Sequence, residues 1–162
     1  MIVETTRFGD IEVDDGSILR MKRGLLGFEE MKRFCLIPHE PNTPFRWLQS
    51  VDLAALAFVV VDPSRFFADY NIEINDVEAS ELEIDDAEHA IVLTTVTIRR
   101  DEQMMTTNLA GPIVINAKTL VGMQIILEND KYGTQHVISD TPALAAPKAG
   151  EAEAGSVMSK AA

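Results

Sequence analysis

The sequence predicts an all-β protein: a single antiparallel β domain, barrel-like, with one or two short helices and a disordered C-terminal tail. Apolar and polar residues alternate with a period of two over much of the chain, and residues 10–14 are a clear example. About ten short runs of this kind are separated by turn residues, a spacing typical of β-sandwiches and small barrels. A chain of 162 residues is one domain's worth and can bury a core without disulfides.

The expected strands cover most of the chain up to residue 127. Val92, Val96 and Ile98 would share one face of a strand over residues 91–98. Pro112 cannot donate a ladder hydrogen bond, so it opens the strand over residues 113–115 from a turn. The other expected strands span residues 2–7, 10–14, 18–21, 33–37, 45–51, 56–61, 70–74, 104–109 and 120–127.

Helical signals occur in two places, and both predict short helices. Asp62 can cap a turn that has Pro63 at its first position. Asn75 and Glu78 have the spacing of a capping box at the start of residues 76–82.

The C-terminal residues differ in composition from the rest of the chain. From Thr141 onward the sequence is rich in Ala, Pro, Gly and Glu, and it has too few large apolar residues to offset the entropy of ordering. We therefore expect a barrel-like domain over residues 1–140 and a disordered Ala-rich tail over residues 141–162.

The charge balance constrains what the protein can bind. The chain carries 26 acidic and 14 basic residues, a formal net charge of −12. Contacts to nucleic-acid phosphates normally use Lys or Arg, so direct binding of nucleic acid is not expected. The same charge favours encounter with a basic partner, which could itself be a nucleic-acid-binding protein.

We expect a soluble cytoplasmic protein that does not bind membranes. The N terminus holds Glu4 and Arg7 in place of an apolar signal core, and the longest apolar run, residues 53–61, is shorter than the roughly 18 residues of a membrane span. The single cysteine, Cys35, lies in an apolar run, which favours a buried, inert thiol in a reducing compartment.

No familiar catalytic or metal-binding pattern is present in the sequence. The three histidines, His39, His89 and His136, lie roughly 50 residues apart, whereas metal sites usually contain a close pair. The sequence also lacks a nucleophile elbow, a Walker loop and a dinucleotide-binding fingerprint. We therefore expect no catalytic residue, no metal and no cofactor.

An acidic run occupies the middle of the chain. No Lys or Arg occurs between Arg65 and Arg99. The run can be a solvated surface, or it can steer a basic partner and repel RNA. Its carboxylates are Asp69, Glu73, Asp76, Glu78, Glu81, Glu83, Asp85, Asp86 and Glu88.

Two further positions allow both a structural and a binding interpretation. Trp47, the only tryptophan, can anchor the core, or it can lie at a partner interface where aromatic residues concentrate. The corner at Asp62 and Pro63 can be a helix cap, or it can present Phe66 and Phe67 for hydrophobic contact.

Five segments in a fixed order make the sequence similar to a known family. They are residues 5–13 (TTRFGDIEV), 24–29 (GLLGFE), 44–50 (PFRWLQS), 56–63 (LAFVVVDP) and 108–119 (NLAGPIVINAKT). In combination they resemble the flagellar assembly factor FliW family, from about Ile2 to His136. The chain departs from the family pattern at Leu26, Gly111 and Met123.

The resemblance implies a regulatory protein that works by binding. It implies antagonism of the RNA-binding translational repressor CsrA and a competing interaction with flagellin, by a protein that we expect to be a monomer when free. Flagellin in the cytoplasm would occupy the protein and leave CsrA free to repress flagellin translation. The partner-binding candidates on this interpretation are Trp47, Asp62, Pro63, Phe66, Asp76, Glu78, Glu81, Glu83, Asp85 and Asp86.

Two other functions stay open from the sequence. A barrel can hold a small ligand, or an enzymatic site of unknown reaction, at its mouth. The protein could also be a general chaperone that binds exposed strands.

Overall fold

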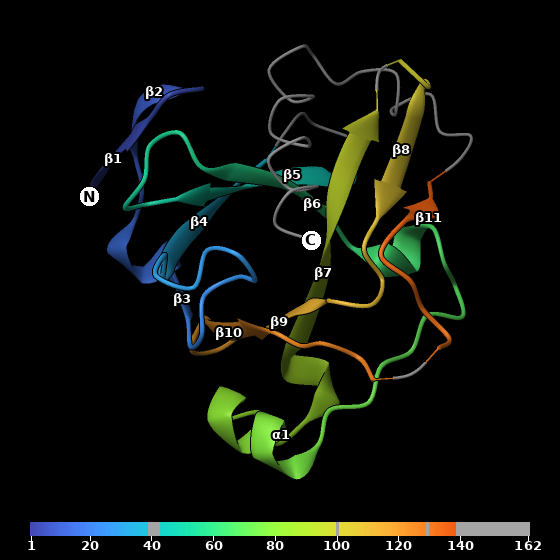
Figure 1. Ribbon diagram of the computed structural model, residues 1–162. Coiled ribbons are helices and arrows are strands. Elements are labelled where there is room, and N and C mark those ends of the chain that lie inside the picture. Colours follow the sequence, from blue (N-terminus) through green and yellow to red (C-terminus); the bar gives the residue numbers. More distant parts are fainter. Residues whose placement is uncertain (39–42, 100, 129, 139–162) are drawn as a thin grey trace.

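The protein is described by a computed structural model that defines residues 1–38, 43–99, 101–128 and 130–138 (Figure 1). The tail expected over residues 141–162 and the histidine at position 39 lie outside the described residues. No helix in the described part of the chain is long and apolar enough to cross a membrane.

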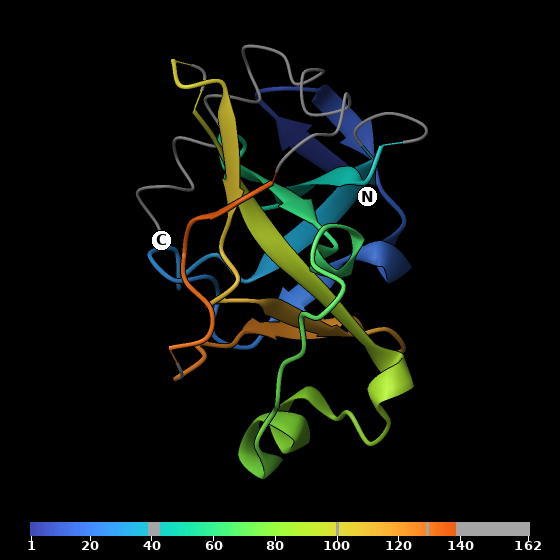
Figure 2. The ribbon, with the colours of Figure 1, turned by 90° about the vertical axis from the view of Figure 1, so that its right-hand side faces the viewer.

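Seven strands close into a barrel, which confirms the predicted fold class. In ring order they are β7 (Ala90–Arg99), β6 (Ala57–Val61), β5 (Phe45–Ser50), β4 (Arg33–Pro38), β3 (Leu19–Met21), β10 (Val121–Gln124) and β9 (Ile113–Asn116). The long strand β7 closes the ring, because Ala90 to Leu93 pair with β9 and Thr94 to Val96 pair with β6. Figure 2 shows β7 running through the length of the molecule.

The remaining strands extend this barrel or lie beside it. β8 (Met104–Thr107) pairs with the second half of β7, and β11 (His136–Val137) pairs with β8. β1 (Ile2–Thr5) and β2 (Gly9–Glu12) form a separate antiparallel hairpin near the N terminus. The two residues of β11 were not expected, because so short a strand has no detectable periodicity.

One strand pair corrects the expectation of a purely antiparallel barrel. β10 pairs with β3 in parallel, with Val121 opposite Arg20 and Gly122 opposite Met21. β3 and β10 are about 100 residues apart in the chain, so no tight hairpin constrains their relative direction. The antiparallel expectation holds for the other strand pairs of the described residues.

Apolar side chains fill the barrel and also cover its outside. The interior cluster includes Phe34, Leu48, Phe58, Val60 and Leu93. Residues of β6 alternate between this interior and an outer cluster that contains Phe45, Trp47 and Val59. All five residues of β6 are therefore buried, which explains why residues 56–61 form a continuous apolar run.

The described structure contains one α-helix and three short 3-10 helices. The helix α1 (Asp76–Leu82) and the 3-10 turn η2 (Pro63–Arg65) occupy the two predicted helical positions. The other two 3-10 turns, η1 (Asp15–Ser17) and η3 (Ala87–His89), were not expected. Asp14 and Asp86 cap them through single side-chain hydrogen bonds.

The prediction of a strand over residues 70–74 is wrong, although half-buried and exposed residues do alternate there. This segment is extended but belongs to no sheet. Ile72 and Ile74 pack on a third apolar cluster formed by Leu82, Met123 and Ile125, while Asn71 and Glu73 stay exposed. The alternation therefore reflects a chain lying across the outer face of the barrel.

The strand expected over residues 120–127 is shorter than predicted. β10 ends at Gln124, although the main-chain N–H groups of Ile125 and Leu127 still donate to Pro112 and Ala110, each at 2.8 Å. Residues 125–128 and the extended segment 71–75 thus lie side by side on the surface that carries α1.

Candidate partner-binding surface

The helix α1 begins at a complete capping box. The Asn75 side chain accepts from the Glu78 N–H at 2.8 Å, and the Glu78 carboxylate accepts from the Asn75 N–H at 3.1 Å. At the other end, Glu83 adopts a left-handed conformation with φ of 57° and stops the helix. Since the helix is only seven residues long, its stability must come mainly from tertiary contacts.

Asn116 supplies one of these contacts from the end of β9. Its side-chain Nδ2 donates to the carbonyl oxygens of Leu82 and Glu83, both at 3.0 Å. Its Oδ1 accepts from the N–H groups of Lys118 and Thr119 at 2.8 and 3.2 Å. One buried amide therefore joins the C terminus of α1 to the turn between β9 and β10.

A second set of contacts joins α1 and β10 to the loop of residues 24–28. Arg23 forms an ion pair with Glu81 of α1 at 2.5 Å. The Gln124 side chain accepts from the Leu26 N–H at 2.8 Å and donates to the Gly111 carbonyl at 3.0 Å. Two of the family-like motifs, residues 24–29 and 108–119, thus meet across Gln124.

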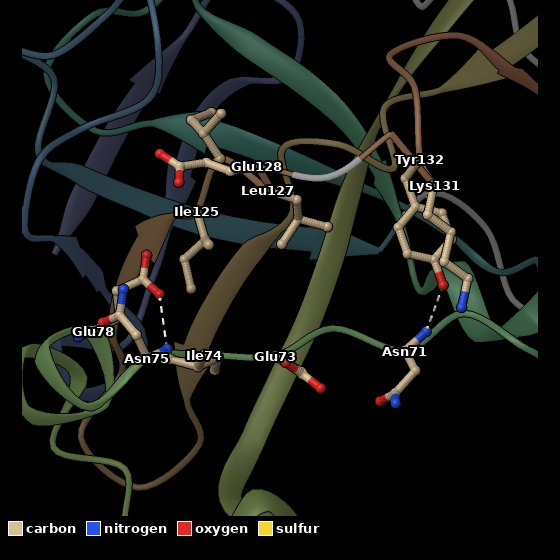
Figure 3. A pocket seen from close by; sticks show the side chains of 11 residues that line it. Asn71, Glu73, Ile74, Asn75, Glu78, Ile125, Leu127, Glu128, Lys131 and Tyr132 are labelled. Carbon is tan, nitrogen blue, oxygen red and sulfur yellow. Dashed lines mark hydrogen bonds between the residues drawn. The ribbon is translucent and has the colours of Figure 1, made fainter.

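A groove of about 640 Å³ lies between α1, the segment 71–75, residues 125–128 and the pair Lys131 and Tyr132 (Figure 3). The side chains of Ile125 and Leu127 point into it. Ile74 and Ile126 also line it, so apolar side chains lie among its polar lining residues. Figure 3 shows Asn71 hydrogen-bonded to Tyr132 at the far end, through the Asn71 N–H and the tyrosine hydroxyl at 3.1 Å.

The charged groups at this groove are predominantly acidic. Glu73, Glu78 and Glu128 line it, against a single lining cation, Lys131. The Lys131 ammonium lies 5.4 Å from the centre of the Tyr132 ring. The groove therefore suits an occupant that carries positive charge beside apolar side chains.

The six acidic candidates on α1 and the following loop differ in their roles, and of the six Glu78 alone lines the groove. Glu78 belongs to the capping box, Glu81 pairs with Arg23, and Asp86 caps η3. Asp76, Glu83 and Asp85 are exposed and form no ion pair within the described residues. Three of the six carboxylates are thus committed to local structure.

The structure places Trp47 outside this surface. Its side chain is 2 % exposed and packs in the outer apolar cluster. The Phe8 ring contacts the Trp47 ring edge-on, with ring centres 5.7 Å apart, and the Arg7 guanidinium lies 4.8 Å from the centre of the Trp47 ring. This burial favours the core interpretation of Trp47.

The corner at Asp62 also has a structural role. The Asp62 carboxylate accepts from the N–H and the hydroxyl of Ser64 at 3.0 and 2.7 Å, and Pro63 is buried. Phe66 and Phe67 are half-buried: Phe66 packs near Phe45, and Phe67 packs against His136. The geometry therefore supports the helix-cap interpretation of this turn, with the two aromatic side chains only partly exposed.

Among the residues that the structure describes, no three His, Cys, Asp or Glu side chains are grouped as a metal site would need. His136 accepts from the Gly133 N–H through Nε2 at 2.7 Å. Cys35 is buried, as expected, and this burial raises the pKa of its thiol. A raised pKa reduces the fraction of reactive thiolate.

Three asparagine and glutamine residues that assemble this surface and its neighbouring turns were not predicted from the sequence. Asn108 accepts from the N–H groups of Ala110 and Gly111, both at 3.0 Å, and so shapes the turn before β9. An Asn two residues before such a turn is a known local signal. For Asn116 and Gln124 no such signal exists, because their partners are distant in the chain.

Comparisons with known proteins agree with this architecture. A sequence model described as FliW protein matches residues 2–138. A relative from Geobacter sulfurreducens is 42 % identical over 143 residues, which cover 88 % of this chain and 89 % of the relative. A relative from Syntrophus aciditrophicus is 41 % identical over 85 % of this chain and 87 % of its own length. Both are named flagellar assembly factor FliW.

A solved structure gives the same result in three dimensions. The crystal structure of a flagellar assembly factor FliW superposes with a TM-score of 0.79 at 34 % identity, covering 88 % of this chain and 99 % of the other. The family match and the identities above cover most of the described barrel. The chain therefore belongs to the FliW family.

Proposed function

We propose that this protein acts in flagellar assembly as a cytoplasmic regulatory binding protein that antagonises CsrA and binds flagellin. The names of its relatives support the flagellar role. The observation that carries the binding role is the acidic surface around α1, with a groove beside it that acidic and apolar side chains line. Such a surface suits recognition of a basic protein better than catalysis.

The electrostatics favour a partner that binds RNA. A protein that contacts phosphates must itself be basic at the contact surface, so it is attracted to an acidic face. The net charge of −12 repels RNA from the same face. The protein would thereby bind the repressor without itself binding the transcript.

Flagellin sets the direction of this regulation. When flagellin accumulates it occupies the protein, and CsrA is left free to repress flagellin translation. When flagellin is exported the protein is released and binds CsrA. Translation of flagellin is thus coupled to flagellar assembly.

The alternative functions have less support. Large buried side chains, including Phe34 and Phe58, occupy the barrel interior, which argues against a ligand site there. A general chaperone for exposed strands would bind unrelated unfolded proteins. Neither alternative explains the acidic surface.

Binding of the purified chain to immobilised CsrA and to immobilised flagellin tests the proposal. We expect each to bind, and we expect prior saturation with flagellin to reduce CsrA binding. Reduced and carboxymethylated lactalbumin is the control for chaperone-like binding. Failure to bind CsrA, or equal binding to the control, contradicts the proposal.

A further inference from the structure

The segment 71–75 runs drawn out along the groove (Figure 3) but belongs to no sheet. Its residues alternate between half-buried and exposed, as in a sheet. Within the described residues, the main-chain groups of Ile72, Glu73 and Ile74 take part in no hydrogen bond. Unpaired main-chain groups in an extended segment are a template for pairing with another chain.

The orientation of these groups can be read from their neighbour. The Asn71 N–H donates to the Tyr132 hydroxyl, which lies on the groove side of the segment. In an extended chain the main-chain groups of alternate residues point to the same side. The N–H and C=O of Glu73 therefore face the groove as the Asn71 N–H does.

The groove floor offers side-chain contacts to the same occupant. On the facing stretch Leu127 is half-buried and Ile126 is 54 % exposed, whereas Ile125, which also points toward the groove (Figure 3), is only 2 % exposed. An extended peptide lying beside Glu73 would place alternate side chains on this floor and the others toward solvent. Ile126 and Leu127 therefore favour a peptide in which alternate residues are apolar.

The charges define the remaining residues of the occupant. Glu73, Glu78 and Glu128 give the lining a formal charge of −3, which Lys131 reduces to −2. A peptide with basic side chains complements this lining, and an acidic one is repelled. The single lining cation, Lys131, lies over the Tyr132 ring.

We propose that this groove binds an extended segment of a basic protein partner, in which basic and apolar residues alternate, by pairing with the main chain of Glu73. This inference names the site at which a basic protein would bind, and it rests on the proposed function for the identity of that protein. The strand that the sequence predicts over residues 70–74 would then complete its pairing only in the complex.

Amide hydrogen exchange of the full chain, resolved by residue, tests the site. The probe is a blocked peptide of about eight residues with alternating Lys and Val, and the matched control has Glu in place of Lys. We expect the Lys–Val peptide to slow exchange of the Glu73 amide at least about tenfold, and the Glu–Val peptide to leave it unchanged. No slowing by the Lys–Val peptide, or equal slowing by both, overturns the proposal.

Two variants separate pairing from charge. Glu73→Gln removes the charge and keeps the N–H, whereas Glu73→Pro removes both. Glu88→Gln, in the same acidic run but outside the groove lining, is the control. We expect weaker Lys–Val binding for Glu73→Pro than for Glu73→Gln, and no change for Glu88→Gln. Equal binding by the two Glu73 variants, each with a native-like amide spectrum, contradicts main-chain pairing.

The same exchange measurement with CsrA distinguishes this inference from the proposed function. If CsrA binds and the Glu73 amide stays unprotected, the groove assignment is wrong and the function stands. If the Lys–Val peptide protects Glu73 but CsrA does not bind, the groove stands and the function is wrong. Protection in the free chain that disappears on dilution, or on truncation after Asp140, identifies a second copy or this chain's own tail as the occupant and overturns the proposal.

Discussion

Replacing Asn116 with alanine should destabilise the protein and loosen α1. The side chain is buried and makes four hydrogen bonds, two to the carbonyls that end α1 and two to the turn after β9. Each is worth about 1 kcal/mol net. Since three of the four are only partly buried, water can replace some of them, and we expect a loss of about 2–4 kcal/mol in the free energy of unfolding.

Urea unfolding measures this loss, and amide exchange in α1 measures its location. Asn116→Asp keeps the acceptors but removes both donors, so it should also release α1. Asn75→Ala removes the cap at the exposed end of the helix and should cost only about 1 kcal/mol. If Asn116→Ala unfolds at the wild-type urea concentration with α1 exchange unchanged, the role that we assign to Asn116 is wrong.

Three further predictions follow from individual groups. Cys35 should react with a thiol reagent in denaturant but not in the native protein, because burial raises its pKa and blocks access, and fast native labelling would contradict this. Burial and the neighbouring Tyr132 raise the pKa of Tyr70, so folding favours its neutral form. The free energy of unfolding should therefore fall as the pH rises above about 10. Urea unfolding at about pH 8 and 11 should show a smaller alkaline loss of stability in Tyr70→Phe than in the wild type. Neutralising Asp76, Glu83 and Asp85 together should slow association with CsrA, more at low than at high salt, and leave dissociation nearly unchanged. Neutralising Glu4, Asp10 and Glu12, which are also exposed but lie on the N-terminal hairpin, should slow association less. Unchanged association rates for the first variant would reject electrostatic steering.

Sequence periodicity was sufficient for the barrel strands but not for their arrangement. It located β4 to β7 closely, because their residues alternate or are buried on both faces. Periodicity cannot distinguish a strand that is hydrogen-bonded into a sheet from an extended segment that only packs on the face of one. It therefore predicted a strand at residues 70–74. The pairing of β3 with β10 depends on barrel closure, which no local pattern encodes.

The site was predictable in charge but not in geometry. The acidic run around α1 and its capping box can be read directly from residues 75–86. The groove could not be predicted, because it forms between segments about 50 residues apart in the chain. The strongest motif, residues 108–119, proved to contain two asparagines whose amides hold turns and α1 in place.

Burial favours the structural interpretation of Trp47 and of the Asp62 corner. Single aromatic residues on a strand are compatible with a core or with an interface, and only contacts distinguish them. Phe8 and Arg7 cover Trp47 from the N-terminal hairpin, a contact that the spacing of these residues does not reveal.

A mobility-shift titration of a CsrA target transcript tests the central claim most directly, since that claim is control of an RNA-binding protein by an acidic protein that does not bind RNA. At about 0.15 M salt, the protein alone should leave the transcript unshifted, and increasing amounts of it should remove the shift caused by CsrA. A shift of the transcript by the protein alone would contradict the account, as would a CsrA shift that persists when the protein is in large molar excess.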